Sequence, residues 1–188
     1  MQDFKLLLHN KNIKHITLDS REVKEGSLFI ALQGFKYNGN KFIKAAIAKG
    51  ASLVFCDNSE EIGDKSTVYF IENLKAQLAD IVKTIYVKTP KELYAVTGTN
   101  GKSSIIDLIR QSKLLLNENI TTIGTLGVYK NNELIENLVN TTPDICKFFQ
   151  ILNENSDDSF AFEASSHGLE QERFAKLKLD TAIFTNLT

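Results

Sequence analysis

Cysteine, proline and tryptophan are scarce in this sequence. Its 188 residues include two cysteines, two prolines, three histidines and no tryptophan. Cys56 and Cys146 are far apart in apolar surroundings, so we expect two reduced, buried thiols instead of a disulfide or a metal pair. His9, His15 and His167 show no metal-ligand spacing with each other or with the cysteines. These absences argue against a disulfide-stabilised scaffold and against a zinc-type site.

A surplus of charge of one sign and a long apolar run are missing as well. The 22 Lys and Arg residues nearly balance the 23 Asp and Glu residues, and no basic run argues for a nucleic-acid partner. No apolar stretch is long enough to span a bilayer, and the N-terminus lacks the features of a secretory signal. The composition therefore predicts a cytoplasmic globular protein with no nucleic-acid partner and no membrane insertion.

The most informative segment that is present is Thr-Gly-Thr-Asn-Gly-Lys-Ser-Ser at residues 97–104. The apolar stretch at 93–96 predicts a strand before it, and the apolar spacing over 105–116 predicts a helix after it. Glycines at such a junction let backbone N–H groups point at phosphate, although Val96 stands where a strict Walker A motif has its first glycine. The predicted nucleotide-binding residues are Gly98, Thr99, Asn100, Gly101, Lys102, Ser103 and Ser104.

A second predicted strand, 159–163, ends in the carboxylate of Glu163. The C-terminal ends of parallel strands lie on one side of a sheet, which is also the side of the phosphate loop. Carboxylate and hydroxyl oxygens are suitable Mg²⁺ ligands, so we predict that Ser103 and Glu163 bind Mg²⁺ there, directly or through water. Residues 164–168 continue as a polar loop at the same edge.

Other parts of the second half contain recognisable turn and helix signals. Asn131 and Asn132, between apolar segments, predict a β-hairpin over 126–138. Thr142 is predicted to cap a helix whose first residue is Pro143. Residues 182–184 form a final apolar strand of the buried type, after which the sequence stops at Thr188. We therefore expect the chain to be a fragment or to have its sheet completed by another segment.

The first half alternates predicted strands and helices, which indicates a small α/β domain. Strands are expected at 16–18, 28–32, 52–56 and 68–71, and helices at 42–47, ended by Gly50, and at 74–82, capped by Asn73. The linker at 86–90 places the boundary near residue 88, giving domains 1–88 and 89–188. Residues 19–21 and 34–40 are binding candidates, although Asp-Ser-Arg at a strand end is more often a turn held by a salt bridge.

Four segments resemble a known family, the Mur ligases. Residues 97–104 are similar to the ATP loop of these enzymes and of their folylpolyglutamate synthetase relatives, in which glycines recur every three residues; Ala95 replaces the first here. Residues 17–21, 140–143 and 163–173 resemble the branch that adds the third peptide residue to the peptidoglycan precursor. The resemblance implies an α/β protein with a small N-terminal α/β UDP-binding domain, followed by a truncated P-loop domain with a parallel sheet.

The resemblance also implies cofactors and residue roles. ATP and Mg²⁺ would be the cofactors, with Lys102, Glu163 and His167 as catalytic residues, although a structural hydrogen bond is an equal alternative for His167. Asn38 and Asn40 stand where the family often has Asp and His, and Ala164 replaces a common valine. The residues implied at the uridine nucleotide are Leu18, Ser20, Phe35, Lys36 and Tyr37, and those implied at the muramyl dipeptide are Asn140, Thr141, Thr142, Ser165, Gln171 and Arg173.

The implied reaction is ATP-dependent amide formation through an acyl phosphate. Its partners would be UDP-N-acetylmuramoyl-L-alanyl-D-glutamate and an amino acid, diaminopimelate or lysine, with the protein acting as a monomer. A Mg²⁺-binding histidine, a carbamoylated lysine and a third domain follow these segments in the family, so the chain is expected to be inactive alone. A non-catalytic nucleotide or UDP-sugar-binding module, or a degenerate ligase fragment, stays open as the alternative. A folate-type ligase is disfavoured because it lacks this N-terminal domain.

Overall fold

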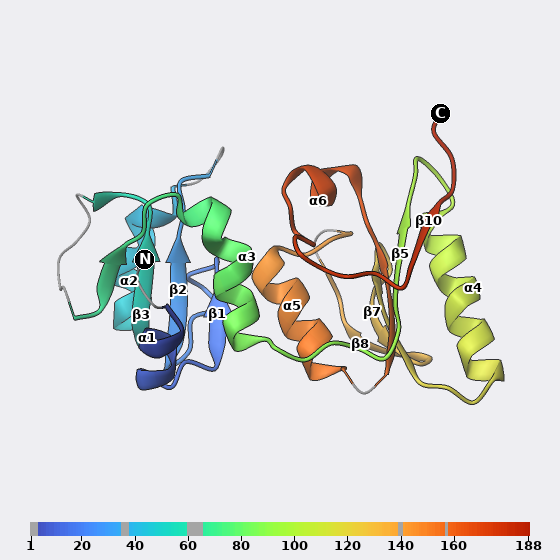
Figure 1. The fold of residues 1–188 in the computed structure, drawn as a ribbon, viewed down its shortest axis with the longest axis horizontal. Helices are drawn as coiled ribbons and strands as arrows, with labels where there is room; N and C mark the ends of the chain where they lie inside the picture. Colours follow the sequence, from blue (N-terminus) through green and yellow to red (C-terminus); the bar gives the residue numbers. More distant parts are fainter. Residues whose placement is uncertain (1–3, 35–37, 60–65, 139–140, 157) are drawn as a thin grey trace. The chain divides into compact units, whose positions relative to one another are not determined.

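The computed structural model describes residues 4–34, 38–59, 66–138, 141–156 and 158–188 (Figure 1). Internal contacts divide the chain into two compact units, Met1–Val87 and Lys88–Thr188. Each unit contains a β-sheet with strands that are mostly parallel, and helices pack on both sheets. The α/β fold class expected from the sequence is therefore confirmed. Within the described residues, no helix has the length and apolar character needed to cross a bilayer.

The first unit is built on a four-stranded, all-parallel sheet in the order β1-β2-β3-β4. Its helices are α1 (Phe4–Asn10), α2 (Ile43–Ala48), preceded by the 3₁₀ helix η1 (Gly39–Phe42), and α3 (Leu74–Ile85). The two central strands are almost continuously apolar because helices cover the sheet. The strands are β1 (His15–Thr17), β2 (Ser27–Ala31), β3 (Ala51–Cys56) and β4 (Val68–Phe70).

The helix ends in this unit agree with the sequence in one case and differ in another. After α2, Gly50 has a φ of +99° and its N–H bonds to the Ile47 carbonyl, so the predicted glycine terminator is confirmed. Asn73 precedes α3 as expected, but its φ of 52° is left-handed and its side chain makes no capping bond. Asparagine serves there because it tolerates a positive φ, not because it accepts from the helix N–H groups.

The second unit contains a six-stranded sheet in the order β10-β5-β9-β6-β7-β8. The first four strands are parallel, and β7 and β8 form an antiparallel hairpin around Asn131, whose φ is 54°. The predicted hairpin is therefore confirmed. The strands are β5 (Leu93–Thr97), β6 (Ile120–Gly124), β7 (Gly127–Lys130), β8 (Glu133–Glu136), β9 (Ser159–Glu163) and β10 (Thr181–Phe184).

Strand β9 shows how both faces of this sheet are filled. Ala161 packs in a cluster with Ile106 of helix α4 (Lys102–Leu115), whereas Phe160 and Phe162 contact Phe148 of helix α5 (Ile145–Glu154). Side chains of a strand alternate between its two faces, so neighbouring residues meet different helices. All five residues of β9 are buried as a result, which places Glu163 in an enclosed position at the end of the strand.

Two predictions for this unit were wrong. Helix α5 is capped by Asp144, whose carboxylate accepts from the N–H groups of Cys146 and Lys147; Pro143 and Thr142 precede the helix. An acidic cap also favours the positive end of the helix dipole, which explains the shift. Strand β10 is largely exposed, with Phe184 63% accessible, because among the described residues it pairs only with β5 and forms the edge of the sheet. Cys56 and Cys146 are separate buried thiols, as expected.

Candidate functional site

The phosphate loop connects the C-terminal end of β5 to the start of α4, as the sequence predicts. Gly98 and Gly101 have φ values of +131° and +85°, a region that favours glycine, and α4 begins at Lys102. The first turn of a helix leaves its N–H groups without partners inside the helix, and the helix dipole adds partial positive charge there. The N–H groups of residues 102–104 are therefore placed to bind an anion.

The Lys102 ammonium lies over this loop. Its Nζ donates to the carbonyl of Gly98 at 2.7 Å and to that of Thr99 at 3.1 Å. These bonds hold a positive charge beside the first turn of α4. A phosphate placed there would meet both the ammonium and the helix N–H groups, which is the arrangement that favours a nucleotide.

Glu163 reaches the phosphate loop because of the order of the strands. Strand β9 pairs with β5 so that Glu163 lies beside Val96, just before the loop. Ser103 Oγ donates to Glu163 Oε1 at 2.8 Å, and the backbone N–H of Thr125 donates to the same oxygen at 2.9 Å. Thr125 Oγ1 also donates to Oε2 at 3.2 Å. Residues from α4, β9 and the β6–β7 turn therefore meet at one carboxylate.

The chemistry of this carboxylate fits a divalent cation. Glu163 is 2% exposed, and within the described part of the chain no basic side chain forms an ion pair with it. A buried carboxylate without a cationic partner is costly, and a carboxylate and a hydroxyl are oxygen donors of the kind that Mg²⁺ prefers. The described residues contain no cluster of three or more His, Cys, Asp or Glu that could hold a metal. Mg²⁺ commonly has few protein ligands, with substrate phosphates and water as the rest.

A second network surrounds Thr142, which is 2% exposed. Its hydroxyl donates to the backbone carbonyl of Glu163 at 3.1 Å and lies 3.0 Å from Ser165 Oγ. Residues 164–168 do not form the predicted loop throughout, because the short helix α6 (Ser166–Glu170) begins there. Ser165 caps this helix by accepting from the N–H of Gly168. The guanidinium of Arg173 donates to the carbonyl of Thr142 and to Gln171 Oε1. These residues lie together beside Glu163, and the Thr142 hydroxyl forms its hydrogen bonds to other groups of the protein.

Two further predicted residues of this unit have different surroundings. Thr141 lies at the site, with its Oγ1 3.2 Å from Thr125 Oγ1. The side chain of His167 is 76% exposed, and Glu170 Oε2 on the same helix lies 3.7 Å from its Nδ1. No bond joins His167 to the phosphate loop or to Glu163 within the described residues. Asn140 lies outside the described residues.

In the first unit, the predicted uridine residues follow the end of β1. Arg21 donates to both carboxylate oxygens of Asp19, so the turn held by a salt bridge is present. The hydrogen bond from Arg21 lowers the pKa of Asp19, with burial acting in the opposite direction. Leu18 and Ser20 flank Asp19 and are half-buried. Phe35, Lys36 and Tyr37 lie outside the described residues.

Sequence reasoning missed several residues at these sites. Thr125 bonds to Glu163, and Asn186 binds the phosphate loop: its carbonyl accepts from the Thr99 N–H at 2.9 Å, and its Oδ1 accepts from the Asn100 N–H at 3.1 Å. In the first unit, Asp57 Oδ1 accepts from the buried Asn40 amide at 2.7 Å. All three residues follow the end of a parallel strand, which is the signal that could have indicated them.

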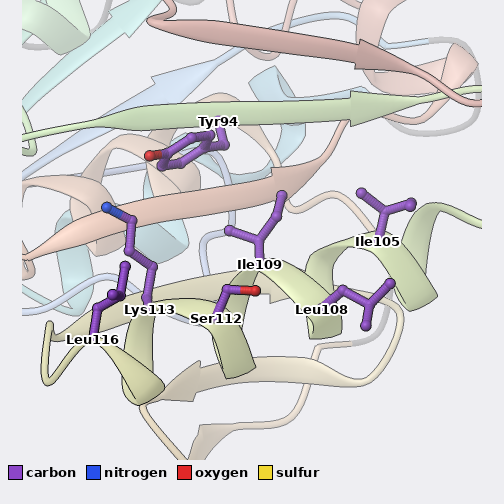
Figure 2. A pocket seen from close by; sticks show the side chains of 7 residues that line it. All are labelled: Tyr94, Ile105, Leu108, Ile109, Ser112, Lys113 and Leu116. Atoms are coloured by element: carbon purple, nitrogen blue, oxygen red, sulfur yellow. The ribbon is translucent and has the colours of Figure 1, made fainter.

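The surface groove in Figure 2 lies away from these residues. It is formed between α4 and β5, and its lining is mostly apolar; Lys113 extends toward the Tyr94 ring, with its Nζ 5.7 Å from the ring centre. The groove contains none of the predicted site residues. Its lining residues are Tyr94, Ile105, Leu108, Ile109, Ser112, Lys113 and Leu116.

Two family models match the chain. Residues 12–100 match the Mur ligase family catalytic domain, and residues 96–188 match the Mur ligase middle domain. The UDP-N-acetylmuramoyl-L-alanyl-D-glutamate–2,6-diaminopimelate ligase of Rickettsia conorii is 38% identical over 99% of this chain and 40% of the relative. The enzyme with the same name from Pseudomonas putida is 39% identical over 94% of this chain and 37% of the relative. The chain thus spans about two fifths of the length of these relatives.

Solved structures give the same grouping. A UDP-N-acetylmuramoyl-L-alanyl-D-glutamate–2,6-diaminopimelate ligase superposes with a TM-score of 0.75 at 30% identity, covering 94% of this chain and 37% of that protein. A MurF ligase from Thermotoga maritima, solved in complex with ADP, superposes with a TM-score of 0.65 at 20% identity. The match covers 99% of this chain and 39% of the MurF chain. At that identity the second likeness supports the fold alone.

Proposed function

Because this chain belongs to the Mur ligase family and carries its N-terminal and middle domains, we propose that it provides the nucleotide-binding parts of an ATP-dependent peptidoglycan ligase. The proposed reaction adds diaminopimelate to UDP-N-acetylmuramoyl-L-alanyl-D-glutamate. The relatives cited above are named for that reaction, which favours diaminopimelate over lysine. The observation that carries the proposal is the bond from Ser103 to Glu163, because it joins the phosphate loop to a buried carboxylate that forms no ion pair with a basic side chain of the described residues.

In this proposal the second unit binds ATP. Lys102 and the N–H groups at the start of α4 contact the phosphates, and Ser103 and Glu163 hold Mg²⁺. The bound Mg²⁺ would neutralise charge between the phosphate groups. The protein positions two anionic substrates, the nucleotide and the dipeptide carboxylate, which would otherwise repel each other. A carboxylate of the dipeptide then attacks the γ-phosphate to give an acyl phosphate and ADP, and an amine displaces phosphate to form the amide.

The other predicted residues are assigned by position. The proposed muramyl-dipeptide side is formed by Thr141, Ser165, Gln171 and Arg173, together with Asn140. Thr142 supports this side from inside the protein, because its hydroxyl contacts the Glu163 carbonyl and Ser165 Oγ. His167 is proposed at the same edge. The first unit is the proposed UDP-binding domain, with Leu18, Ser20 and residues 35–37 at the uridine. We propose that the protein acts in the cytoplasm, where ATP is available as a substrate, and that it acts as a monomer.

Calorimetry on the 188-residue chain tests this proposal. We expect Mg²⁺–ATP and UDP-N-acetylmuramoyl-L-alanyl-D-glutamate each to bind with a stoichiometry of about one, as expected for one small-molecule site per domain. GTP and UDP-glucose serve as matched controls for the base and for the muramyl group. Failure of both proposed ligands to bind would contradict the assignment. Binding of both, with no acyl phosphate formed even when the parts of a relative that this chain does not match are added, would favour a non-catalytic binding module.

A further inference from the structure

Gly124, the last residue of β6, and Thr125, in the turn that follows, enclose the Glu163 carboxylate, although none of the sequence motifs includes them. Thr125 binds both carboxylate oxygens: its N–H donates to Oε1 at 2.9 Å and its hydroxyl donates to Oε2 at 3.2 Å. Ser103 adds a bond to Oε1 at 2.8 Å from the opposite element, α4. The direction in which the carboxylate points is therefore set by two separate parts of the fold.

Gly124 supplies the space that the carboxylate occupies. A Cβ atom at this position would lie 2.2 Å from Glu163 Oε1 and 2.8 Å from its Cδ, both closer than real Cβ contacts. Strand pairing produces this proximity, because β6 lies beside β9 with Ile123 opposite Phe162. Gly124 is not among the residues with positive φ, so its backbone conformation does not require glycine. The requirement is for room beside Glu163.

Thr125 also links the carboxylate to the segment at Thr141. Its Oγ1 lies 3.2 Å from Thr141 Oγ1 while it donates to Glu163 Oε2. One hydroxyl thus connects the carboxylate near the phosphate loop with the first described residue of the proposed dipeptide segment. A change at Thr125 would disturb the orientation of Glu163 without removing any of the proposed ligands.

We propose that Gly124 and Thr125 are positioning residues that hold Glu163 in the orientation required to bind the Mg²⁺ of a nucleotide together with Ser103. This inference rests on the proposed function. Glu163 is buried, and the ion pairs of the described residues do not include it, so hydrogen-bond donors must stabilise its charge before a cation arrives. Thr125 supplies two of these donors, and Gly124 leaves the room that the carboxylate group occupies.

The inference is tested by the dependence of nucleotide binding on Mg²⁺. The dissociation constant of fluorescent mant-ADP for the 188-residue chain is measured in EDTA and in saturating Mg²⁺. The readout is the dissociation constant in EDTA divided by the dissociation constant in Mg²⁺. Gly124→Ala should lower this ratio about tenfold or more, and Thr125→Val by about three- to tenfold, as expected for loss of hydrogen bonds to a charged group. Thr125→Ser, which keeps the hydroxyl, should restore most of the ratio.

Leu126→Ala is the matched control, because this residue lies in the same turn, is 64% exposed and forms none of the bonds to Glu163. Its ratio should equal that of the wild type. General damage to the fold would weaken binding in EDTA and in Mg²⁺ alike and leave the ratio unchanged. If Gly124→Ala does not fold, the comparison of Thr125→Val with Thr125→Ser decides.

The outcomes separate this inference from the function on which it rests. If the wild-type chain binds no nucleotide, or binds it equally with and without Mg²⁺, the proposed Mg²⁺–nucleotide site fails and the inference fails with it. If the wild type depends on Mg²⁺ and the Thr125→Val ratio is unchanged, the inference alone is overturned. An equal loss in Leu126→Ala would also overturn it, because the effect would then belong to the turn as a whole.

Discussion

The phosphate loop contains two glycines with positive φ, and we predict that alanine is tolerated far less at Gly98 than at Gly101. At Gly98 a Cβ atom would lie 2.1 Å from Thr185 Oγ1 and 2.9 Å from the Asn186 carbonyl oxygen. At Gly101 the nearest atom outside the loop would be 3.9 Å away. Gly98→Ala therefore introduces a steric clash in addition to backbone strain, whereas Gly101→Ala introduces strain alone.

The expected magnitudes follow from these two terms. A non-glycine residue held at positive φ costs about 1–3 kcal/mol, and forcing extra atoms into a packed position costs about 1–3 kcal/mol more. The loop conformation at Gly98 should therefore become less favourable by about 2–6 kcal/mol, against about 1–3 kcal/mol at Gly101. Because a ligand must select the binding-competent loop, mant-ADP affinity should fall about a hundredfold or more for Gly98→Ala and about tenfold for Gly101→Ala.

The assay is a mant-ADP titration in Mg²⁺, with circular dichroism to confirm folding. The double variant Gly98→Ala/Thr185→Ala removes the closest clash and should recover affinity in part, since the Asn186 carbonyl contact stays. Thr185→Ala alone is the reference, because it loses the bond from Thr185 Oγ1 to the Asn100 carbonyl. Equal losses for Gly98→Ala and Gly101→Ala, or no recovery in the double variant, would refute this account of the loop.

Three further predictions concern charge, packing and pH. Lys102→Ala should weaken Mg²⁺–ADP binding by about 10- to 100-fold in calorimetry, because a charge-assisted contact to phosphate is lost; wild-type affinity would contradict its role. Phe148→Ala should lower the free energy of unfolding of the second unit by about 3–5 kcal/mol in urea, since its ring is fully buried against Phe160, Phe162 and Phe174. A loss below about 1 kcal/mol would contradict this packing. The hydrogen bond from Lys113 lowers the pKa of Glu92 from its ordinary value of 4.5. The pair of Lys113 and Glu92 therefore stabilises the folded chain above pH 4.5, and this stabilisation is lost as the pH falls through the lower pKa of the folded state. Glu92→Gln should therefore lower the free energy of unfolding by at most about 1 kcal/mol at neutral pH, because the carboxylate is partly exposed, and should leave it unchanged in strong acid. A difference between the two denaturation curves that persists in strong acid would contradict this pairing.

The segment that follows β10 bears directly on the phosphate loop. Asn186 accepts from the N–H groups of Thr99 and Asn100, and the Thr185 N–H donates to the Thr97 carbonyl. Two of the loop N–H groups are therefore already used inside the protein. We therefore expect the N–H groups at the start of α4 and the Lys102 ammonium to contribute most to phosphate binding, whereas Gly98 and Gly101 act through the conformation of the loop.

Local signals in the sequence were sufficient for the phosphate loop and for most strands and helices, but not for the short helices α1 and α6. The apolar stretch before Thr97 and the helical spacing after Lys102 depend on neighbouring residues, and so does the Asn131–Asn132 turn. Local signals failed where two residues competed for one role. Thr142 and Asp144 can both cap a helix, and the hydroxyl of Thr142 bonds instead to the carbonyl of Glu163, which is distant in sequence.

By itself the sequence determined the α/β class, the phosphate loop and the presence of an acidic strand end. The tertiary structure decided which side chains meet there. Strands β5, β9 and β6 are neighbours in the sheet but not in chain order, so the position of Glu163 between Ser103 and Thr125 follows from pairing between distant segments. Periodicity and turn chemistry act over a few residues, whereas strand order is set by burial of the whole sheet, and for that reason the contacts of Gly124 and Thr125 with Glu163 could not be derived from the sequence.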